Sequence, residues 1–255
     1  MDEASDAPRA SGVVVMVTCE HGGNEVPPDL VHLFASEAGR LTGHRGYDAG
    51  ALEMARGFAA AFAAPLFFST VTRLVVDGNR SVGHPKLFSR TTRPLSRDLR
   101  RDILKRYHQP LRRETLAAVS AARAVGLTVV HLSSHSFVPV FRGRERTMDV
   151  GLLYDPGRTG ERGLCLAWKR GIEAARPELR VRRNAPYRGV SDGHVTALRK
   201  RFPQGYLGIE LEVNQRFFLN NQPIFNELLD LLPRTLAAAL NAVGLPADVT
   251  SPSPS

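Results

Sequence analysis

Two histidines stand directly after apolar runs in this sequence. His21 follows the run that begins at Val13, and His135 follows the run LTVVHLSS. Two histidines at neighbouring strand ends are typical of a catalytic zinc, which takes three protein ligands and keeps one position for water. A hydrogen-bonded structural role is the alternative for each histidine. Three carboxylates near these runs are candidates for a third ligand: Glu20, Asp48 and Asp77.

The choice among these carboxylates stays open on local sequence. Glu20 and His21 are adjacent, so their side chains diverge on an extended backbone, which weakens Glu20 as a partner of His21. Asp48 lies at the start of a helical pattern, where an acid also serves as an N-cap. The two glycines after His21 are expected to let the backbone approach the metal or substrate closely.

Glu210 is the candidate proton carrier. It lies in the apolar run GYLGIELEV, where a buried carboxylate is unfavourable unless it is paired or functional. Strand alternation places Glu210 and Glu212 on the same face of this run, opposite its apolar residues. Amide hydrolysis by an activated water needs a base to take a proton and an acid to protonate the leaving amine. An ion pair with one of the many arginines is the alternative for either glutamate.

The segment RLVVDGNRS offers groups that bind a carboxylate. Arg80 provides a fork of N–H donors that matches carboxylate geometry, Asn79 adds an amide, and Asp77 is placed to orient Arg80. A turn followed by an ordinary surface arginine is the alternative. CEHGGN lacks the spacings of phosphate-binding loops, no G-x-S-x-G elbow occurs, and HLSSHS has no obvious orienting acid for a serine nucleophile.

Composition restricts the class of protein. The chain has 255 residues, 43% of them hydrophobic and 23% charged, which is ordinary for a globular domain with a sizeable core. No apolar run approaches the roughly 20 residues that span a bilayer, and the acidic start MDEASDAPRASG is unlike a secretory signal. Cys19 and Cys165 form no spaced framework. We therefore predict a cytoplasmic protein with no membrane partner.

The net charge of +9 raises three classes of partner: nucleic acid, a membrane surface or an anionic small molecule. The 34 Lys and Arg residues form no long block, and neither an RNA-binding signature nor zinc-finger spacing occurs. We expect a small anionic substrate and no nucleic acid, and the family resemblance given below implies that this substrate is a carboxylate-bearing amide. A non-catalytic or nucleic-acid-binding basic α/β protein is the alternative, and the sequence makes no prediction of oligomeric state.

Apolar runs alternate with helical patterns along the chain, which is typical of βαβ crossovers. Strands are predicted at 13–19, 65–70, 73–77, 127–133, 148–154, 179–183 and 205–213. Helices are predicted at 29–38, 48–63, 96–124, 160–176, 191–201 and 221–243, with Pro110 expected to kink or split the third.

The prediction is a single α/β domain over 13–245, with a mixed, mostly parallel sheet flanked by helices. A disordered arm at 1–12 and a disordered tail at 246–255 are expected on either side. Because ligands bind at the carboxyl ends of strands in such sheets, the polar residues above should meet in one site.

Seven segments of the chain resemble the N-formylglutamate amidohydrolase family, whose members are similar in fold to zinc carboxypeptidases and to the aspartoacylase and succinylglutamate desuccinylase group. In family order, between residues 19 and 218, they are CEHGGNEVP, HRGYDAGALEMA, TRLVVDGNRS, HLSSHSFVP, DVGLLYDP, NAPYRG and LGIELEVNQRF. The resemblance implies a hydrolase that cleaves a linear amide, typically a formyl or acyl group on an amino acid. It also supports zinc as the metal at His21 and His135.

The resemblance implies roles for individual residues. Glu210 matches the glutamate that acts as general acid/base in the related aspartoacylases. The segment from Asp77 to Arg80 matches the segment that holds the substrate carboxylate in the relatives, with Gly78 where leucine is usual.

Two departures from the relatives qualify these implications. Asn24 stands where the carboxypeptidase-type His-x-x-Glu has its glutamate, so the third ligand must come from elsewhere. Asp48 is the preferred substitute, with Glu20 or a shifted Glu25 as alternatives. The enzymes of histidine degradation read closer to Pro-His-Ser-Gly near the first histidine, whereas this chain has CEHGG, so its substrate need not be N-formylglutamate.

Further residues are expected to contact the substrate. Arg73 or Arg146 is expected to help stabilise the oxyanion that forms on the amide. The segments NAPYRG and SDGHV are expected to form a loop over the pocket, with Tyr187, Arg188 and His194 as substrate contacts.

Overall fold

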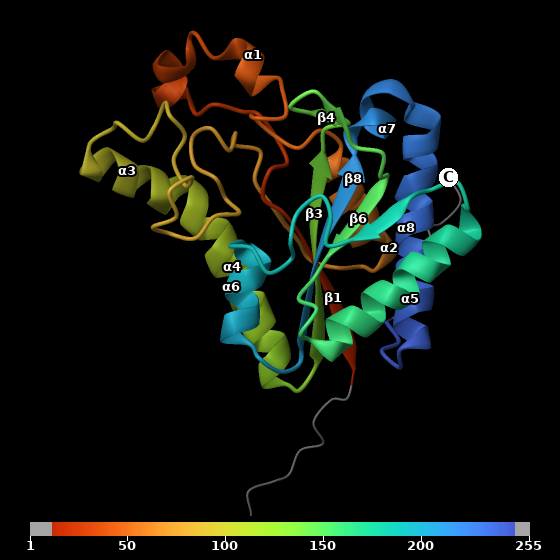
Figure 1. Cartoon of the computed structure of the whole chain (residues 1–255). Coiled ribbons are helices and arrows are strands. Elements are labelled where there is room, and N and C mark those ends of the chain that lie inside the picture. The colour runs from red at the N-terminus through yellow and green to blue at the C-terminus, as the bar shows by residue number, and fades with distance from the viewer. Residues whose placement is uncertain (1–11, 248–255) are drawn as a thin grey trace, which may run out of the picture.

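Runs rich in Val, Leu and Ile form one six-stranded sheet in the computed structural model, which describes residues 12–247 (Figure 1). The order across the sheet is β2–β1–β3–β8–β6–β7. Neighbours run parallel, except that β6 is antiparallel to β8. The strands are β1 (Val13–Cys19), β2 (Leu66–Phe68), β3 (Thr128–Phe137), β6 (Val150–Leu153), β7 (Val181–Arg183) and β8 (Tyr206–Asn214). The predicted single α/β domain with a mixed, mostly parallel sheet is confirmed.

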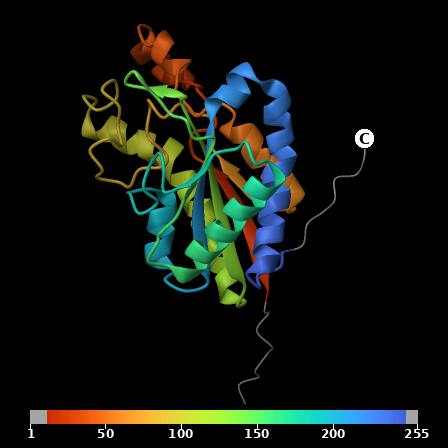
Figure 2. The ribbon, with the colours of Figure 1, turned by 45° about the vertical axis from the view of Figure 1, so that its right-hand side comes forward.

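Helices cover both faces of this sheet (Figures 1 and 2). One face packs against α2 (Ala51–Ala61), α5 (Thr159–Ala175) and α8 (Gln222–Ala242), and the other against α4 (Gln109–Ala124) and α6 (His194–Arg201). On the first face, Val17, Leu132 and Leu211 are fully buried in the main core around Trp168. The alternate residues of β1, β3 and β8 point to the second face, where Met16, Val129 and Tyr206 belong to a smaller apolar cluster. Toward the carboxyl ends of the strands the same face becomes polar, with Ser133, His135, Glu210 and Glu212, as the alternation predicts for Glu210. The first face therefore supplies most of the apolar core, and the carboxyl-end half of the second face can carry chemistry.

The long helical pattern at 96–124 is divided, as Pro110 predicts. It forms α3 (Arg97–Ile103), a π-helical turn (Leu104–His108) and α4. Pro110 lies in the first turn of α4, directly after the π-helical turn, which is a position that tolerates proline. Ser96 caps α3 by accepting a hydrogen bond from the backbone N–H of Leu99.

The prediction of a strand at 73–77 is wrong. Residues 73–75 form a turn and 76–77 have no regular secondary structure, and Leu74, Val75 and Val76 are buried in a second apolar cluster with Leu30 and Phe34 rather than in the sheet. The apolar run reflects burial beneath a neighbouring segment, which periodicity alone does not separate from a buried strand. That segment, predicted as one helix at 29–38, is a 3-10 helix (Pro28–Phe34) followed by the short α1 (Ala38–Leu41). Three short elements were not predicted: β4 (Val140–Phe141), β5 (Arg144–Glu145) and α7 (Gln215–Asn220).

The predicted arm and tail lie almost wholly outside the described residues. Residues 246–247, placed in the tail by the prediction, are described, and Ala247 packs against the main core. Between residues 12 and 247, every helix is either too short or too polar to cross a membrane.

Candidate active site

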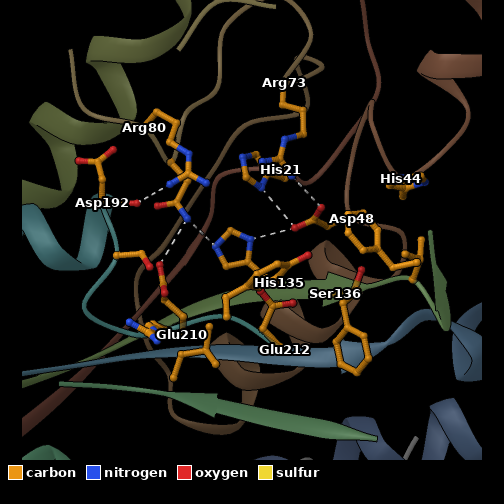
Figure 3. Close-up of a pocket in the computed structure, with 18 residues that line it drawn as sticks. His21, His44, Asp48, Arg73, Arg80, His135, Ser136, Asp192, Glu210 and Glu212 are labelled. Atoms are coloured by element: carbon orange, nitrogen blue, oxygen red, sulfur yellow. Dashed lines mark hydrogen bonds and ion pairs between the residues drawn. The ribbon is translucent and has the colours of Figure 1, made fainter. Parts of the chain in front are cut away.

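A cavity of about 180 Å³ opens at the carboxyl ends of β1, β3 and β8 (Figure 3). His21 enters it from just beyond β1, and His135 enters it from the last residues of β3. The parallel register pairs His135 with Glu212, and Ser133 with Glu210, so these four side chains share the polar face of the sheet. The site therefore lies where strand ends meet, as the sequence predicts.

Asp48 lies between the two histidines. Its Oδ2 is 3.2 Å from His21 Nδ1 and 2.9 Å from His135 Nδ1, and all three side chains are buried. The ligand atoms of the three residues lie within 4.8 Å of one another. Asp48 does not cap α2, whose N-cap position is Gly50 with no side-chain hydrogen bond. These three residues form a group that can hold a metal ion.

A carboxylate stands behind each histidine. Asp77 Oδ1 lies 2.7 Å from His21 Nε2, while Glu20 Oε2 lies 3.3 Å from His135 Nε2. Ser133 Oγ is also 3.0 Å from His135 Nε2. Histidines that bind metals nearly always donate their second N–H to a carboxylate, carbonyl or water, which fixes the tautomer and the ring orientation. Both histidines therefore present Nδ1 to the same point, as metal ligands would.

The charges around this point favour a cation. Burial alone would lower the pKa of His135, but hydrogen bonds with Asp48 and Glu20 raise it well above its ordinary value. Burial would raise the pKa of Asp48, but the charge of His21 and the hydrogen bond with His135 lower it. The cluster thus binds a proton strongly between carboxylates, and a divalent cation would satisfy the same carboxylates.

Glu20 and Asp77 lie outside the group of His21, Asp48 and His135, and each contacts a histidine of that group from behind. Glu20 accepts a hydrogen bond from Ser133 at 2.7 Å, and its other oxygen lies 2.9 Å from His194 Nδ1. It is therefore oriented toward His135 rather than its sequence neighbour His21. Asp77 contacts the side chains of His21 and Arg73 and does not orient the side chain of Arg80.

The residues after His21 also differ from expectation. A Cβ added at Gly23 would meet the carbonyl oxygen of Thr70 at 2.5 Å, so this glycine permits a close approach of two backbone segments rather than of metal or substrate. Asn24 is half-buried, and Glu25 lies at the surface, where it accepts a hydrogen bond from Thr70.

Two glutamates project from β8 into the cavity. Glu210 accepts a hydrogen bond from Asn79 at 3.3 Å, and burial raises its pKa above the ordinary value. Burial also raises the pKa of Glu212, to about 8, and its Oε2 has no hydrogen-bond partner in residues 12–247. Asn79 Nδ2 lies 3.4 Å from His135 Nε2, and its Oδ1 accepts from the backbone of His194. Asn79 thus links a metal-site histidine to the candidate proton carrier.

The arginines are distributed unequally around the cavity. Arg73 donates to Asp48 at 3.3 Å and to Asp77 at 2.8 Å, which holds both carboxylates against the histidines. Arg80 donates to the carbonyl oxygen of Asp192 at 2.6 Å, while its buried Nε has no partner in residues 12–247. Its guanidinium therefore keeps donors available for an anionic ligand.

The remaining predicted contacts fall into two groups. Tyr187 and Arg188 line the outer wall of the cavity. His194 is buried beneath the site against Glu20, and Arg146 lies outside the lining, with its guanidinium 5.4 Å from the Tyr187 ring centroid. Ser133 and Asp192 lie in segments that the sequence singles out, HLSSHS and SDGHV, but the sequence assigns neither residue a role of its own. Ser133 alternates with His135 on one strand face, which is a signal for its contact with that histidine, whereas no feature of SDGHV marks Asp192 as the partner of Arg80.

Comparisons with known proteins show the family of the chain. The family model for N-formylglutamate amidohydrolase matches residues 13–219. The chain belongs to the N-formylglutamate amidohydrolase family. It is therefore a hydrolase that acts on linear amide bonds, and membership in this family argues against the non-catalytic alternative. The buried group of His21, Asp48 and His135 is its possible metal site.

Solved structures resemble the whole fold. A gene product from Agrobacterium tumefaciens is 27% identical with a TM-score of 0.78, over 90% of this chain and 91% of that one. The N-formylglutamate amidohydrolase from Ralstonia eutropha is 18% identical with a TM-score of 0.68, over 93% of this chain and 96% of that one. No curated protein sequence matches this chain.

Proposed function

We propose that this member of the N-formylglutamate amidohydrolase family is a metal-dependent enzyme that hydrolyses an N-formyl or N-acyl amino acid bearing a carboxylate. One observation carries the proposal: the Nδ1 atoms of His21 and His135 converge on Asp48 Oδ2, and each histidine has a carboxylate behind it. Two imidazole nitrogens and one carboxylate oxygen are a donor set typical of catalytic zinc. We therefore assign His21, Asp48 and His135 as ligands and zinc as the metal.

Glu20 and Asp77 are assigned as carboxylates that orient the ligands. Glu20 is directed to His135, and Asp77 to His21, so the adjacent residues Glu20 and His21 serve opposite sides of the site. This arrangement agrees with the divergence of neighbouring side chains on an extended backbone.

Arg80 and Asn79 are assigned two tasks together: they bind the substrate carboxylate, and they position the amide. Arg80 lines the cavity that the substrate must enter, no carboxylate of residues 12–247 forms an ion pair with it, and a planar guanidinium can bind a carboxylate through two parallel hydrogen bonds. Tyr187 and Arg188 supply the outer wall around the bound molecule.

Glu210 is assigned as general base and then general acid. A divalent metal, when bound, lowers the pKa of a water molecule and polarises the amide carbonyl. Glu210 takes a proton from the attacking water and returns it to the nitrogen that leaves as an amine. Burial raises its pKa above the ordinary value, which favours a carboxyl group that must first accept and then donate a proton. The hydrogen bond from Asn79 fixes the carboxyl group for both transfers.

Arg73 is the nearer of the two arginines considered for oxyanion stabilisation, because it lines the cavity and Arg146 does not. Its contacts with Asp48 and Asp77 give it a second role, which is to hold these carboxylates in place.

A substrate panel tests the proposal. The purified protein, supplied with zinc, is assayed for amine release from N-formyl, N-acetyl and N-succinyl derivatives of acidic and neutral amino acids. We expect hydrolysis of at least one carboxylate-bearing amide, lost in His135→Ala together with the metal. Absence of hydrolysis across the panel by a zinc-loaded protein would contradict the proposal.

A further inference from the structure

Aromatic side chains form one wall of the candidate active site. Phe137, Phe141 and Tyr187 come from separate segments, which are the last residue of β3, the second residue of β4 and the loop after β7. All of them line the same cavity of about 180 Å³ as His135 and Glu210. Phe137 is buried, whereas Phe141 and Tyr187 are 40% and 48% exposed. This surface, which we call the aromatic wall, therefore offers apolar area to a bound molecule.

Arg146 holds the aromatic wall together from behind. Its guanidinium carbon lies 5.7 Å from the ring centroid of Phe137, 4.7 Å from that of Phe141 and 5.4 Å from that of Tyr187. A guanidinium within about 6 Å of a ring centroid is attracted to the ring. Arg146 does not line the cavity, so the rings rather than the guanidinium face a bound molecule. The rings are therefore parts of one surface and are not exposed independently of one another.

The residues that act on the amine half of the substrate lie at one end of the cavity. In the proposed reaction, Arg80 binds the carboxylate of this half and Glu210 protonates its nitrogen. Asn79 connects the two, because it precedes Arg80 in the chain and donates to Glu210 at 3.3 Å. Figure 3 shows Arg80, Asp192 and Glu210 on the same side of His135. The amine half therefore occupies this end.

The aromatic wall stands at the opposite end of the cavity. His44 and Ser136 lie on the side away from Arg80 in Figure 3. Phe137 directly follows Ser136 at the end of β3. Burial and then nearby charges, that of Arg146 among them, lower the pKa of His44, so Arg146 lies close to His44. Because the acyl half points away from the leaving amine, it is the half that meets the aromatic wall.

Resting on the proposed function, we propose that the acyl half of the substrate is an apolar group larger than formyl, aromatic or branched aliphatic, that packs against Phe137, Phe141 and Tyr187. A formyl group ends in a hydrogen atom and would leave these rings uncovered. Packing of an aromatic group against a ring adds a factor of about two to ten to the effect of buried area. The aromatic wall then selects the acyl half, while Arg80 selects the amine half.

A matched series of acyl groups tests this proposal in the zinc-loaded protein. Glutamate and alanine each carry acetyl, isovaleryl, phenylacetyl or succinyl on the amino group, and kcat/KM is measured from release of the amine. The released amine is the same within each series, so only the acyl group varies. Isovaleryl and succinyl are similar in length, but succinyl ends in a carboxylate. Formyl is left out of the series, because its carbonyl carbon lacks an alkyl substituent and reacts faster for that reason alone.

Two variants separate the aromatic wall from general effects. The wall variant combines Phe141→Ala and Tyr187→Ala, which removes two half-exposed rings and leaves the buried Phe137 in place. The control variant is Phe68→Ala. Phe68 is 44% exposed and has the Arg56 guanidinium 5.7 Å from its ring centroid, but it lies on β2, outside the cavity lining.

We expect the wild-type protein to prefer isovaleryl or phenylacetyl over acetyl by about tenfold or more in kcat/KM, since one added methylene in an apolar pocket is worth about that factor. The wall variant should lose about tenfold of this preference, because each lost ring contact is worth a factor of about two to ten. The control variant should keep it. Since the preference is a ratio within one protein, a general loss of activity leaves it unchanged.

Three results would overturn the proposal. One is an equal rate for acetyl and for both apolar groups, and another is an equal loss of preference in both variants. The third is a preference for succinyl, which would show that the charges of Arg146 and Arg188 select the acyl group. A preference for phenylacetyl identifies an aromatic acyl group, and a preference for isovaleryl identifies a branched aliphatic one.

The failure of this proposal is distinguishable from the failure of the proposed function. If only formyl derivatives are hydrolysed, the proposed function stands and the aromatic wall has no part in selecting the substrate. If no amide is hydrolysed, the proposed function fails, and calorimetric titration with the same compounds tests the wall as a binding site. Tighter binding of isovaleryl or phenylacetyl than acetyl derivatives, lost only in the wall variant, supports the site, and equal binding refutes it.

Discussion

Replacing Asp77 by asparagine should weaken metal binding although Asp77 is not assigned as a ligand. Asp77 Oδ1 lies 2.7 Å from His21 Nε2, and its Oδ2 accepts from Arg73 at 2.8 Å. Asparagine keeps the shape and one acceptor oxygen but removes the charge that makes His21 a stronger ligand. It also leaves Arg73 to pair with Asp48 alone, which withdraws negative charge from the third ligand.

The size of this effect follows from the role of outer carboxylates. Their loss typically costs 10–100-fold in metal affinity, or about 1.4–2.7 kcal/mol at 1.36 kcal/mol per factor of ten. Glu20→Gln should cost about tenfold or less, because Glu20 is 3.3 Å from His135 Nε2 and Ser133 Oγ stands closer, at 3.0 Å. The predicted order of zinc affinity is therefore wild type, Glu20→Gln, Asp77→Asn.

Competition with a chromophoric chelator at fixed pH measures these affinities. Asp149→Asn is the matched control, because Asp149 is also buried and paired with an arginine, Arg216, but lies outside the cavity lining. An Asp77→Asn protein that binds zinc within twofold of wild type would refute the reasoning. So would an equal loss in Asp149→Asn, because the effect would then be one of general destabilisation.

Three further predictions test other parts of the account. Glu210→Gln should bind zinc normally and lose about 10²–10⁴-fold in kcat, which is the usual contribution of general acid–base catalysis. If its kcat equals that of the wild type in the same assay, Glu210 has no part in the mechanism. Arg80→Lys should raise KM for a carboxylate-bearing substrate about tenfold or more while metal content stays constant, because an ammonium point charge replaces a planar guanidinium with two parallel donors. An unchanged KM would show that Arg80 does not bind the substrate. His131 is fully buried between Thr18 and Tyr206, and burial lowers its pKa to about 3. Since the unfolded chain takes up this proton near pH 6.5 and the folded one does not, stability should fall with decreasing pH, by about 2 kcal/mol between pH 8 and pH 5 from this residue. The free energy of unfolding is measured by urea denaturation at pH 8 and pH 5 for the wild type and for His131→Gln. The difference between the two pH values should be smaller in the variant by about 2 kcal/mol, and an equal difference in both proteins would contradict the assignment.

Several features of the fold and site follow from local sequence. His21 and His135 stand at strand ends because apolar runs define β1 and β3, and ligands bind beyond the ends of parallel strands. Glu210 shares the polar face of β8 because side chains alternate along a strand. These predictions rest on the spacing of apolar and polar residues within one segment, so they need no knowledge of contacts with other segments.

Other features depend on contacts between distant segments. Asp48 reaches the histidines because its backbone N–H bonds to the carbonyl of His21, a contact that no local pattern encodes. Glu20 faces His135 because β1 and β3 are neighbours in parallel register. The run at 73–77 has the apolar pattern of a strand because burial in a small secondary core produces the same pattern.

Removal and return of the metal test the central claim most directly. The protein is treated with a chelator, its metal content is measured, and hydrolysis of the best carboxylate-bearing amide is followed while zinc is added back. The account predicts that activity is lost with the metal and recovers in proportion to zinc, reaching its maximum at about one ion per chain, the stoichiometry of a single site with three protein ligands. Full hydrolysis by protein freed of metal would contradict it.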